Sequence, residues 1–176
     1  MRETQRCKFI IQELLEFARD KEPRKIPASI TTILQKSLNI LENEFRLRHI
    51  RIEKDLTSAL PESCIDANQL EQVFVNLLLN AAQAIDDNGT ITIRTRMNPA
   101  RHELVVDIID TGCGIPTENF SKIFEPFFST KKNGSGLGLA VSFGIIKNHQ
   151  GRLEVSSRPG QGSQFTVALP ASRDPA

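Results

Sequence analysis

A line of side-chain amides follows one face of a predicted helix. The line is formed by Gln72, Asn76, Asn80 and Gln83, which recur at intervals of four, four and three positions. Apolar side chains occupy the opposite face of the same segment. Amide oxygens are neutral hard ligands, which Mg²⁺ accepts when phosphate groups supply most of the negative charge. The line therefore predicts a metal–phosphate site, with a half-exposed polar helix face as the alternative.

The stretch KKNGSGLGLA, from Lys131 to Ala140, places three glycines at alternate positions behind two lysines. A P-loop carries its lysine after the glycines, and a dinucleotide fingerprint follows a strand directly, so neither spacing matches. A helix that begins near Leu137 would still offer free backbone N–H groups and a positive dipole end to phosphate. Taken alone, the stretch fits a phosphate loop and a plain flexible loop equally well.

An aspartate ends a predicted strand in the segment DIIDTGCGIP. Gly112 and Gly114 follow Asp110 and allow the backbone to turn tightly against a ligand. An ionised carboxylate accepts hydrogen bonds and donates none, so Asp110 is suited to an exocyclic amine such as N6 of adenine. An Asx turn at the end of a strand is the alternative.

These residues need a scaffold that brings them together, and the periodicity of the chain predicts one. Apolar spacings of three and four predict helices over residues 4–20, from Ser29, from Asp66 and over about 137–149. Strands are predicted in IRIEKDL, TITIRTRM, ELVVDIID, GRLEVSS and SQFTVALP, and the prolines of KEPRKIP mark a linker. The predicted fold class is an α/β sandwich, in which helices cover one face of a mixed, mostly antiparallel sheet.

Two finer expectations concern single side chains. Asp66 is expected to cap the helix that follows it, with Gln69 as its capping-box partner. Phe124 and Phe127, in FEPFFSTKK, are expected in the core, because phenylalanine packs inside more often than it faces a ligand.

The composition narrows the class of protein. A net charge of +1 gives no sign of nucleic-acid binding. Cys7, Cys64 and Cys113 lie far apart and form neither a disulfide framework nor a zinc motif, which suits a reducing compartment. The apolar runs are too short to cross a bilayer, so a cytoplasmic location is expected.

Taken together, the motifs resemble those of sensor histidine kinases. NLLLNAAQAI is similar to the N box, DTGCGIP to the first glycine box, FEPFFSTK to the F box and GSGLGLA to the second glycine box. GQGSQFTVALP is similar to the closing glycine segment, so five motifs in order span residues 66–170. The resemblance implies the GHKL ATP-binding fold, with ATP held beneath a mobile lid.

The resemblance also implies roles for individual residues. Asn80 would bind Mg²⁺, Asn76 would support it, Asp110 would read adenine, and Lys131 would face the phosphates; the two asparagines and Lys131 form the implied catalytic set. The implied nucleotide contacts are Asn76, Asn80, Asp110, Gly112, Gly114, Ile115, Phe128, Lys131, Lys132, Gly134, Ser135, Gly136, Leu137, Gly138, Leu139 and Thr166. Many relatives carry Lys or Arg where Gln83 stands, so a phosphate contact there is open, and Lys131 or Lys132 is a candidate for that charge.

The position of Asn76 separates transfer from hydrolysis. Relatives that hydrolyse ATP, such as type II topoisomerases, carry a glutamate there that activates water, and an amide cannot act as that base. The chain is therefore expected to hold ATP for transfer of its γ-phosphoryl group. A serine kinase of the anti-sigma type and a pure interaction module remain as alternatives.

The expected acceptor is a histidine on a dimerisation hairpin. Neither His49, His102 nor His149 stands in an acceptor-like stretch, so the chain is expected to lack that histidine. Residues 1–22 resemble the end of the hairpin and a linker, residues 23–171 the catalytic domain, and residues 172–176 a tail. The implied partners are ATP and ADP, the hairpin of a homodimer, and the receiver domain of a response regulator, with no nucleic acid.

Overall fold

The computed structural model describes residues 23–131 and 134–171 of the chain. The helix predicted over residues 4–20, the side chain of Lys132 and the tail from residue 172 lie outside the described residues. None of the helices in the described part is long and apolar enough to cross a membrane.

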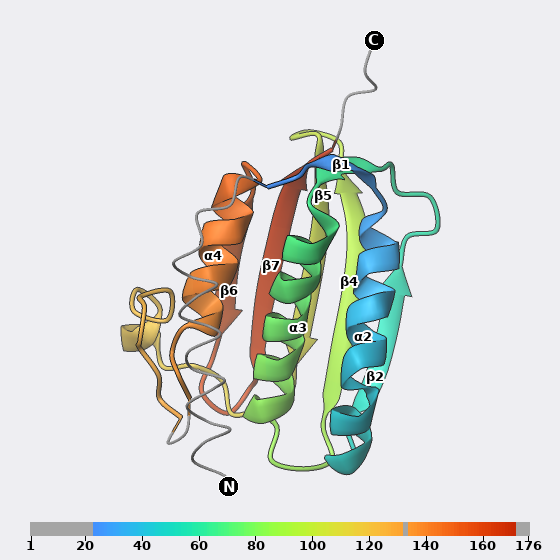
Figure 1. Ribbon diagram of the computed structural model, residues 1–176. Helices are drawn as coiled ribbons and strands as arrows, with labels where there is room; N and C mark the ends of the chain where they lie inside the picture. Colours follow the sequence, from blue (N-terminus) through green and yellow to red (C-terminus); the bar gives the residue numbers. More distant parts are fainter. Residues whose placement is uncertain (1–22, 132–133, 172–176) are drawn as a thin grey trace, which may run out of the picture.

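The centre of the fold is a five-stranded sheet in the order β2-β4-β5-β7-β6 (Figure 1). Its strands are β2 (Arg51–Leu56), β4 (Thr90–Asn98), β5 (Glu103–Asp110), β6 (Arg152–Ser157) and β7 (Ser163–Pro170). β2 runs parallel to β4, and the other pairs are antiparallel. The predicted mixed, mostly antiparallel sheet is therefore confirmed.

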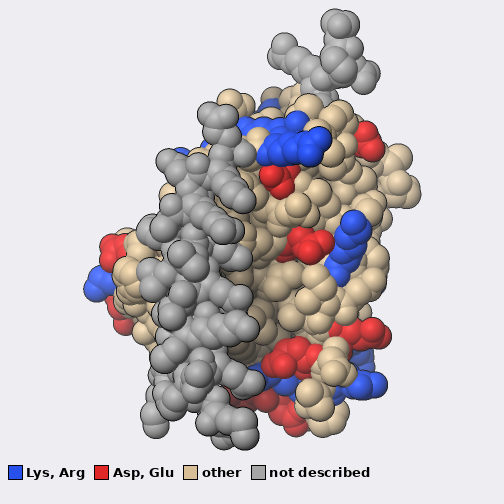
Figure 2. Space-filling view, in the orientation of Figure 1, with Lys and Arg blue, Asp and Glu red and all other residues tan. Residues whose placement is uncertain are grey.

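Within the described residues, three helices cover one face of this sheet: α2 (Ile30–Leu47), α3 (Ala67–Ala84) and α4 (Gly138–Asn148) (Figure 1). The Ser29 hydroxyl caps α2 by accepting from the N–H of Thr32, and the carboxylate of Asp66 caps α3. A short 3₁₀ turn, η1 (Thr117–Asn119), precedes the loop that leads to α4. Figure 2 shows Lys and Arg interspersed with Asp and Glu on the helix-covered face, where uncharged residues predominate.

The core forms where the helices meet the sheet. The apolar stripe predicted for α3 is fully enclosed, with Leu70, Val73, Phe74, Leu77 and Leu78 each at 0 % exposure. Burying a side chain of this size contributes on the order of 1.5–3 kcal/mol, so this single helix anchors much of the core. The spacing of the stripe is what directs the amide line of α3 away from the sheet.

Two short strands were not expected from the sequence. β1 (Ile26–Ala28) pairs antiparallel with β3 (Ser63–Ile65), outside the main sheet. β1 includes part of the segment predicted as a linker. Three-residue strands are too short to show alternation, which explains why the periodicity did not indicate them.

Asp66 caps α3 as expected, but the prediction that Gln69 is its capping-box partner is wrong. The carboxylate of Asp66 accepts from the N–H groups of Asn68 and Gln69. In a capping box the Gln69 side chain would accept from the N–H of Asp66, whereas that N–H donates to Nε2 of His149 at 3.0 Å. Oε1 of Gln69 is buried with no hydrogen-bond partner.

His149 thus joins the end of α4 to the start of α3. It is 4 % exposed, and Nδ1 donates to the carbonyl of Ile145 at 2.8 Å, which leaves Nε2 as the acceptor for Asp66. Burial lowers the pKa of His149, and the charge of Lys25 lowers it further, against the opposing effects of the Ile145 hydrogen bond and Asp66. The folded protein therefore holds this imidazole neutral.

This histidine predicts a pH-dependent stability. Because the folded state lowers its pKa, its contribution is complete above a pH of about 6.5 and is lost as the pH falls below that value. Urea unfolding between pH 8 and pH 5 should show the loss, with a slope of at most about 1.4 kcal/mol per pH unit from this group. His149→Gln should flatten the profile, whereas His102→Asn, at an exposed turn, should not. Equal profiles for His149→Gln and the unmodified chain would exclude this origin.

Candidate functional site

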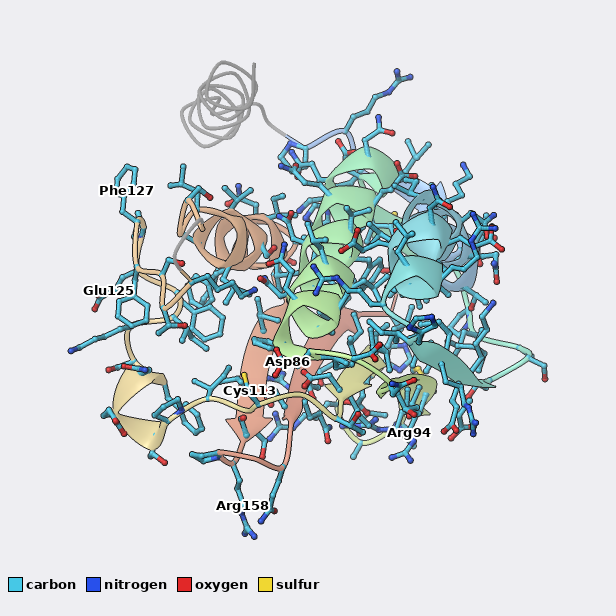
Figure 3. The ribbon with its side chains drawn as sticks, turned by 90° about the horizontal axis from the view of Figure 1, so that it is seen from below. Asp86, Arg94, Cys113, Glu125, Phe127 and Arg158 are labelled. Atoms are coloured by element: carbon cyan, nitrogen blue, oxygen red, sulfur yellow. The ribbon has the colours of Figure 1, made fainter. Side chains whose placement is uncertain are left out.

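Most of the predicted site residues that the structure describes gather at one end of the helix layer, the lower end in Figure 1. There α3 and β5 end, and α4 and β7 begin. Figure 3 views this end directly and shows Cys113, in the loop after β5, near the end of α3 where Asp86 lies. Glu125 and Phe127 lie at the outer side, beyond α4, and Arg158 points away from the molecule.

Asp110 is buried at this end and oriented by the backbone. Its Oδ1 accepts from the N–H of Gly112 at 2.8 Å and from the N–H of Ser163 at 3.3 Å. Burial raises the pKa of Asp110, although these hydrogen bonds and the charge of Lys131 oppose the rise. The side chain of Ser163 also hydrogen-bonds the carboxylate, and neither backbone bond involves Oδ2, so the carboxylate of Asp110 is held in one orientation at this end of the sheet.

The loop after Asp110 is held between α3 and the β6–β7 turn. The N–H of Cys113 donates to the carbonyl of Ala84 at 2.9 Å, and the carbonyl of Cys113 accepts from the N–H of Gly160 at 2.7 Å. Gly114 has a φ of +73°, and a Cβ there would collide with the carbonyl of Arg158. The N–H of the next residue, Ile115, donates to the hydroxyl of Ser157 at 2.8 Å, which fixes the exit of the turn.

The start of α4 differs from the starts of α2 and α3. Leu137, its N-cap residue, is fully buried and provides no side-chain cap. The N–H of Leu137 donates to the hydroxyl of Ser135 at 3.3 Å, and Leu139 packs against the core. The N–H groups of the first turn, from Gly138 on, therefore lack a capping side chain, which is the arrangement that binds phosphate at a helix start.

Asn76 ties this start to α3. Its Nδ2 donates to the carbonyl of Gly138 at 3.3 Å and lies 3.5 Å from the hydroxyl of Ser142. The contact places the uncapped turn of α4 beside the amide line of α3. Asn76 is therefore part of the frame of the site as well as its lining.

Lys131 reaches across the site to the amide line. Its Nζ donates to Oδ1 of Asn80 at 2.9 Å and to Oε1 of Gln83 at 2.7 Å. The residue as a whole is exposed, whereas its ammonium group is partly enclosed. This desolvation lowers the pKa of Lys131, and nearby Cys113 and Asp110 oppose the effect.

The segment before α4 brings further predicted residues to this end. Phe128 is half-buried against the core, and Gly136 accepts from the N–H of Phe127 through its carbonyl at 3.0 Å. Gly134 lies next to Ser129. Phe124 packs against Phe143 with ring centroids 5.3 Å apart, as expected for a core residue. Phe127 is 63 % exposed, so its expected place in the core is wrong.

Thr166 does not join the site. It pairs with Asp107 across β5 and β7, and its hydroxyl donates to that carboxylate at 2.7 Å, on the sheet face away from the helices. Ser163 is the residue of β7 opposite Asp110. Strand alternation could have identified Ser163 in place of Thr166. Thr166 is three positions from Ser163, so the two side chains point to opposite faces of the sheet.

The amide line fits a cation. The ammonium of Lys131 already lies within hydrogen-bond distance of two of its oxygens, on Asn80 and Gln83. Among the described residues, no three His, Cys, Asp or Glu side chains cluster to hold a metal ion. A Mg²⁺ ion here would therefore take Asn80 as its protein ligand and most of its other ligands from phosphate and water.

Comparison with known proteins identifies the family of the chain. Residues 65–173 match the family of histidine kinase-, DNA gyrase B- and HSP90-like ATPases, and the chain belongs to this family. Among curated proteins, it is 38 % identical over 161 residues to the signal transduction histidine-protein kinase AtoS of Escherichia coli K12, covering 92 % of this chain and 26 % of AtoS. It is 37 % identical over 181 residues to the sensory histidine kinase/phosphatase NtrB of Rhodobacter capsulatus, covering 97 % of this chain and 50 % of NtrB.

Solved structures extend the likeness to the fold. The nucleotide-free catalytic domain of histidine kinase ThkA superposes with a TM-score of 0.76 at 27 % identity, covering 85 % of this chain and 99 % of that domain. ThkA in complex with the response regulator TrrA gives a TM-score of 0.83 at 25 % identity, covering 99 % of this chain and 50 % of ThkA. The chain is an ATP-binding catalytic domain of the sensor histidine kinase type, and it spans from about a quarter to a half of the curated relatives named above.

The site predicts that substitutions of Asp110 on β5 and of Thr166 on β7 affect ATP binding differently. Asp110→Ala should weaken ATP binding on the order of ten- to a hundredfold, because it would remove the expected charge-assisted hydrogen bond to adenine, worth roughly 1.5–3 kcal/mol. Thr166→Val should leave affinity unchanged, since its hydroxyl lies on the far face of the sheet. Calorimetric titration measures both. An equal loss in the two variants would contradict the assignment of faces.

Proposed function

We propose that this domain binds Mg·ATP between α3 and α4 and transfers the γ-phosphoryl group to a histidine on a dimerisation hairpin. The observation that carries the proposal is the convergence, at one end of the helix layer, of buried Asp110, the uncapped start of α4 and the oxygen of Asn80. These groups match the base, the phosphates and the metal of one ligand.

The roles of the residues follow from their chemistry. Asp110 accepts from the exocyclic amine of adenine, and Gly112 and Gly114 let the loop lie close to the base. The N–H groups at the start of α4 bind the phosphates, and Lys131 adds a positive charge. Mg²⁺, held by Asn80, supplies charge neutralisation on the phosphate oxygens.

The site favours transfer over hydrolysis. The α3 residue that contacts the start of α4 is Asn76, and an amide cannot take a proton from water. Phosphoryl transfer needs chiefly positioning and charge stabilisation, which the helix start and Lys131 supply. The bond from the γ-phosphorus to the bridging oxygen then breaks as the bond to the imidazole nitrogen forms, and ADP leaves.

We further propose the organisation of the whole protein. Residues 1–22 end the dimerisation hairpin and form a linker, residues 23–171 form the catalytic domain, and residues 172–176 are a tail. The domain works in the cytoplasm as part of a homodimer, and a response regulator receives the phosphoryl group. The complex of ThkA with TrrA supports that partner.

The histidines of the described chain support an acceptor elsewhere. Both ring nitrogens of His149 are engaged, with Ile145 and Asp66, and the ring is buried. His49 lies 3.0 Å from Asp87, but it follows the end of α2 with a φ of +52° and so is not within a helix.

Supplying the hairpin in trans tests the proposed reaction. With radiolabelled Mg·ATP, a separate polypeptide that carries the acceptor histidine should gain an acid-labile label. The reaction should be slow and depend on hairpin concentration, because the two parts are no longer tethered. Asn80→Ala should abolish the labelling while the domain stays folded, since it removes the proposed Mg²⁺ ligand.

Other outcomes of that labelling experiment contradict the proposal. Label on this chain itself would point to one of its own histidines, such as His49, whose Nδ1 lies 3.0 Å from Oδ1 of Asp87. Acid-stable label on a serine of a partner protein would identify a serine kinase of the anti-sigma type. Absence of Mg·ATP binding in a titration would leave an interaction module.

A further inference from the structure

The contact between Lys131 and the amide line has a feature that the proposed function does not use. Nζ of Lys131 lies on the oxygen of Asn80, the proposed ligand of Mg²⁺, at 2.9 Å, and on the oxygen of Gln83 at 2.7 Å. The two acceptors come from one face of α3, and the lysine comes from the segment that precedes α4. The positive charge of the Lys131 ammonium therefore already lies against Oδ1 of Asn80, the oxygen that is proposed to bind Mg²⁺.

We infer that Lys131 is a cation that holds the place of Mg²⁺ in the nucleotide-free protein, and that Gln83 is the positioning residue that keeps it in the site when the metal enters. The inference rests on the proposed function, because it concerns how the same site takes up Mg·ATP. It adds a competition between a side chain of the protein and the metal for a single oxygen.

The competition follows from charge and distance. A Mg²⁺ ion on Oδ1 of Asn80 would approach to about 2.1 Å. The ammonium now on that oxygen would then lie only a few ångströms from a double positive charge, and the two would repel each other. Lys131 must therefore give up Asn80 when the metal binds.

Gln83 gives the displaced ammonium a second acceptor. Its bond to Lys131 is the shorter of the two, and Gln83 stands three positions beyond Asn80, almost one helical turn away. The ammonium can keep this bond while it turns toward the phosphates. A lysine or arginine at position 83 would repel Lys131 instead, so the neutral amide is what makes the arrangement possible.

The chain contains a matched pair away from the site. Nζ of Lys54, on β2, donates to Oε1 of Gln35, on α2, at 3.1 Å. The chemistry is the same, but Lys54 has one amide acceptor among the described residues and no proposed metal ligand beside it. Lys54→Met therefore removes an equal charge and an equal type of bond, and serves as the control.

The first test uses the nucleotide-free protein and measures hydrogen exchange of lysine ammonium groups by ¹⁵N NMR. The Lys131 ammonium should exchange at least several-fold more slowly than that of Lys54, because it has two acceptors. Asn80→Ala and Gln83→Leu should each accelerate it. Exchange of Lys131 as fast as that of Lys54 would overturn the inference.

The second test measures how much Mg²⁺ strengthens ATP binding, as the ratio of the dissociation constant in EDTA to that in Mg²⁺. In Lys131→Met this ratio should rise about tenfold, since the metal no longer displaces a cation, while Lys54→Met should keep the original ratio. Gln83→Leu should change the ratio in the unmodified chain and have no effect in the Lys131→Met background. An equal effect in both backgrounds would show that Gln83 does not act through Lys131.

The outcomes separate this inference from the proposed function. If the unmodified chain binds ATP neither with nor without Mg²⁺, the proposed function fails. If it binds ATP but Lys131→Met leaves the metal ratio unchanged, the competition is overturned and the ATP site stands.

Discussion

The helix α3 packs against the sheet with one face and carries the amide line of the site on the other, so the packing of the first face fixes the position of the second. One side of this helix is fully enclosed against the sheet, where Leu70, Phe74 and Leu77 have no exposed surface. Rotation of the helix would expose that stripe at a cost of several kcal/mol, so its orientation is fixed. The amide line on its other side is thereby fixed as well. Asn76 and Asn80 owe their positions mainly to the packing of their apolar neighbours, and the bond from Asn76 to the carbonyl of Gly138 joins this side of the site to α4.

Hydrogen bonds at both ends of α4 set its distance from α3. Asn76 donates to the carbonyl of Gly138 at one end, and the N–H of Asp66 donates to His149 at the other. Each bond joins residues more than sixty positions apart in sequence, so the two helices are held at both ends by polar contacts and between them by apolar packing. The chain before α2 also reaches the upper end, where the N–H of Arg24 donates to Asp66 and Nζ of Lys25 to the carbonyl of Asn148.

The sequence predicted the long elements well because each carries a period that packing enforces. The strands β5 and β7 and the buried stripe of α2 lie where alternation and helical spacing placed them. Two of the misses depend on partners distant in sequence: the three-residue strand β1 pairs with β3, and the N–H of Asp66 donates to His149 instead of Gln69. Phe127 is a separate miss, because its side chain is exposed. Thr166 is different, because alternation from Ser163 already excludes it from the face of Asp110.

The charge of the site explains why an exposed segment can contribute to it. The line on α3 offers amides, which bind a cation without adding a negative charge that would repel ATP. The buried carboxylate, Asp110, accepts backbone hydrogen bonds and is proposed to bind adenine, whereas the proposed phosphate contacts are the N–H groups at the start of α4. Positive charge for the phosphates can then come from Lys131, which is exposed and whose segment is not fixed by a long buried stripe. A lysine on α3 itself would be held in one position by the packing of that helix. Lys131, on the segment before α4, is proposed to contact the amides when nucleotide is absent and the phosphates when it is bound. The neutral line of α3 is thus the condition for a mobile charge in this site.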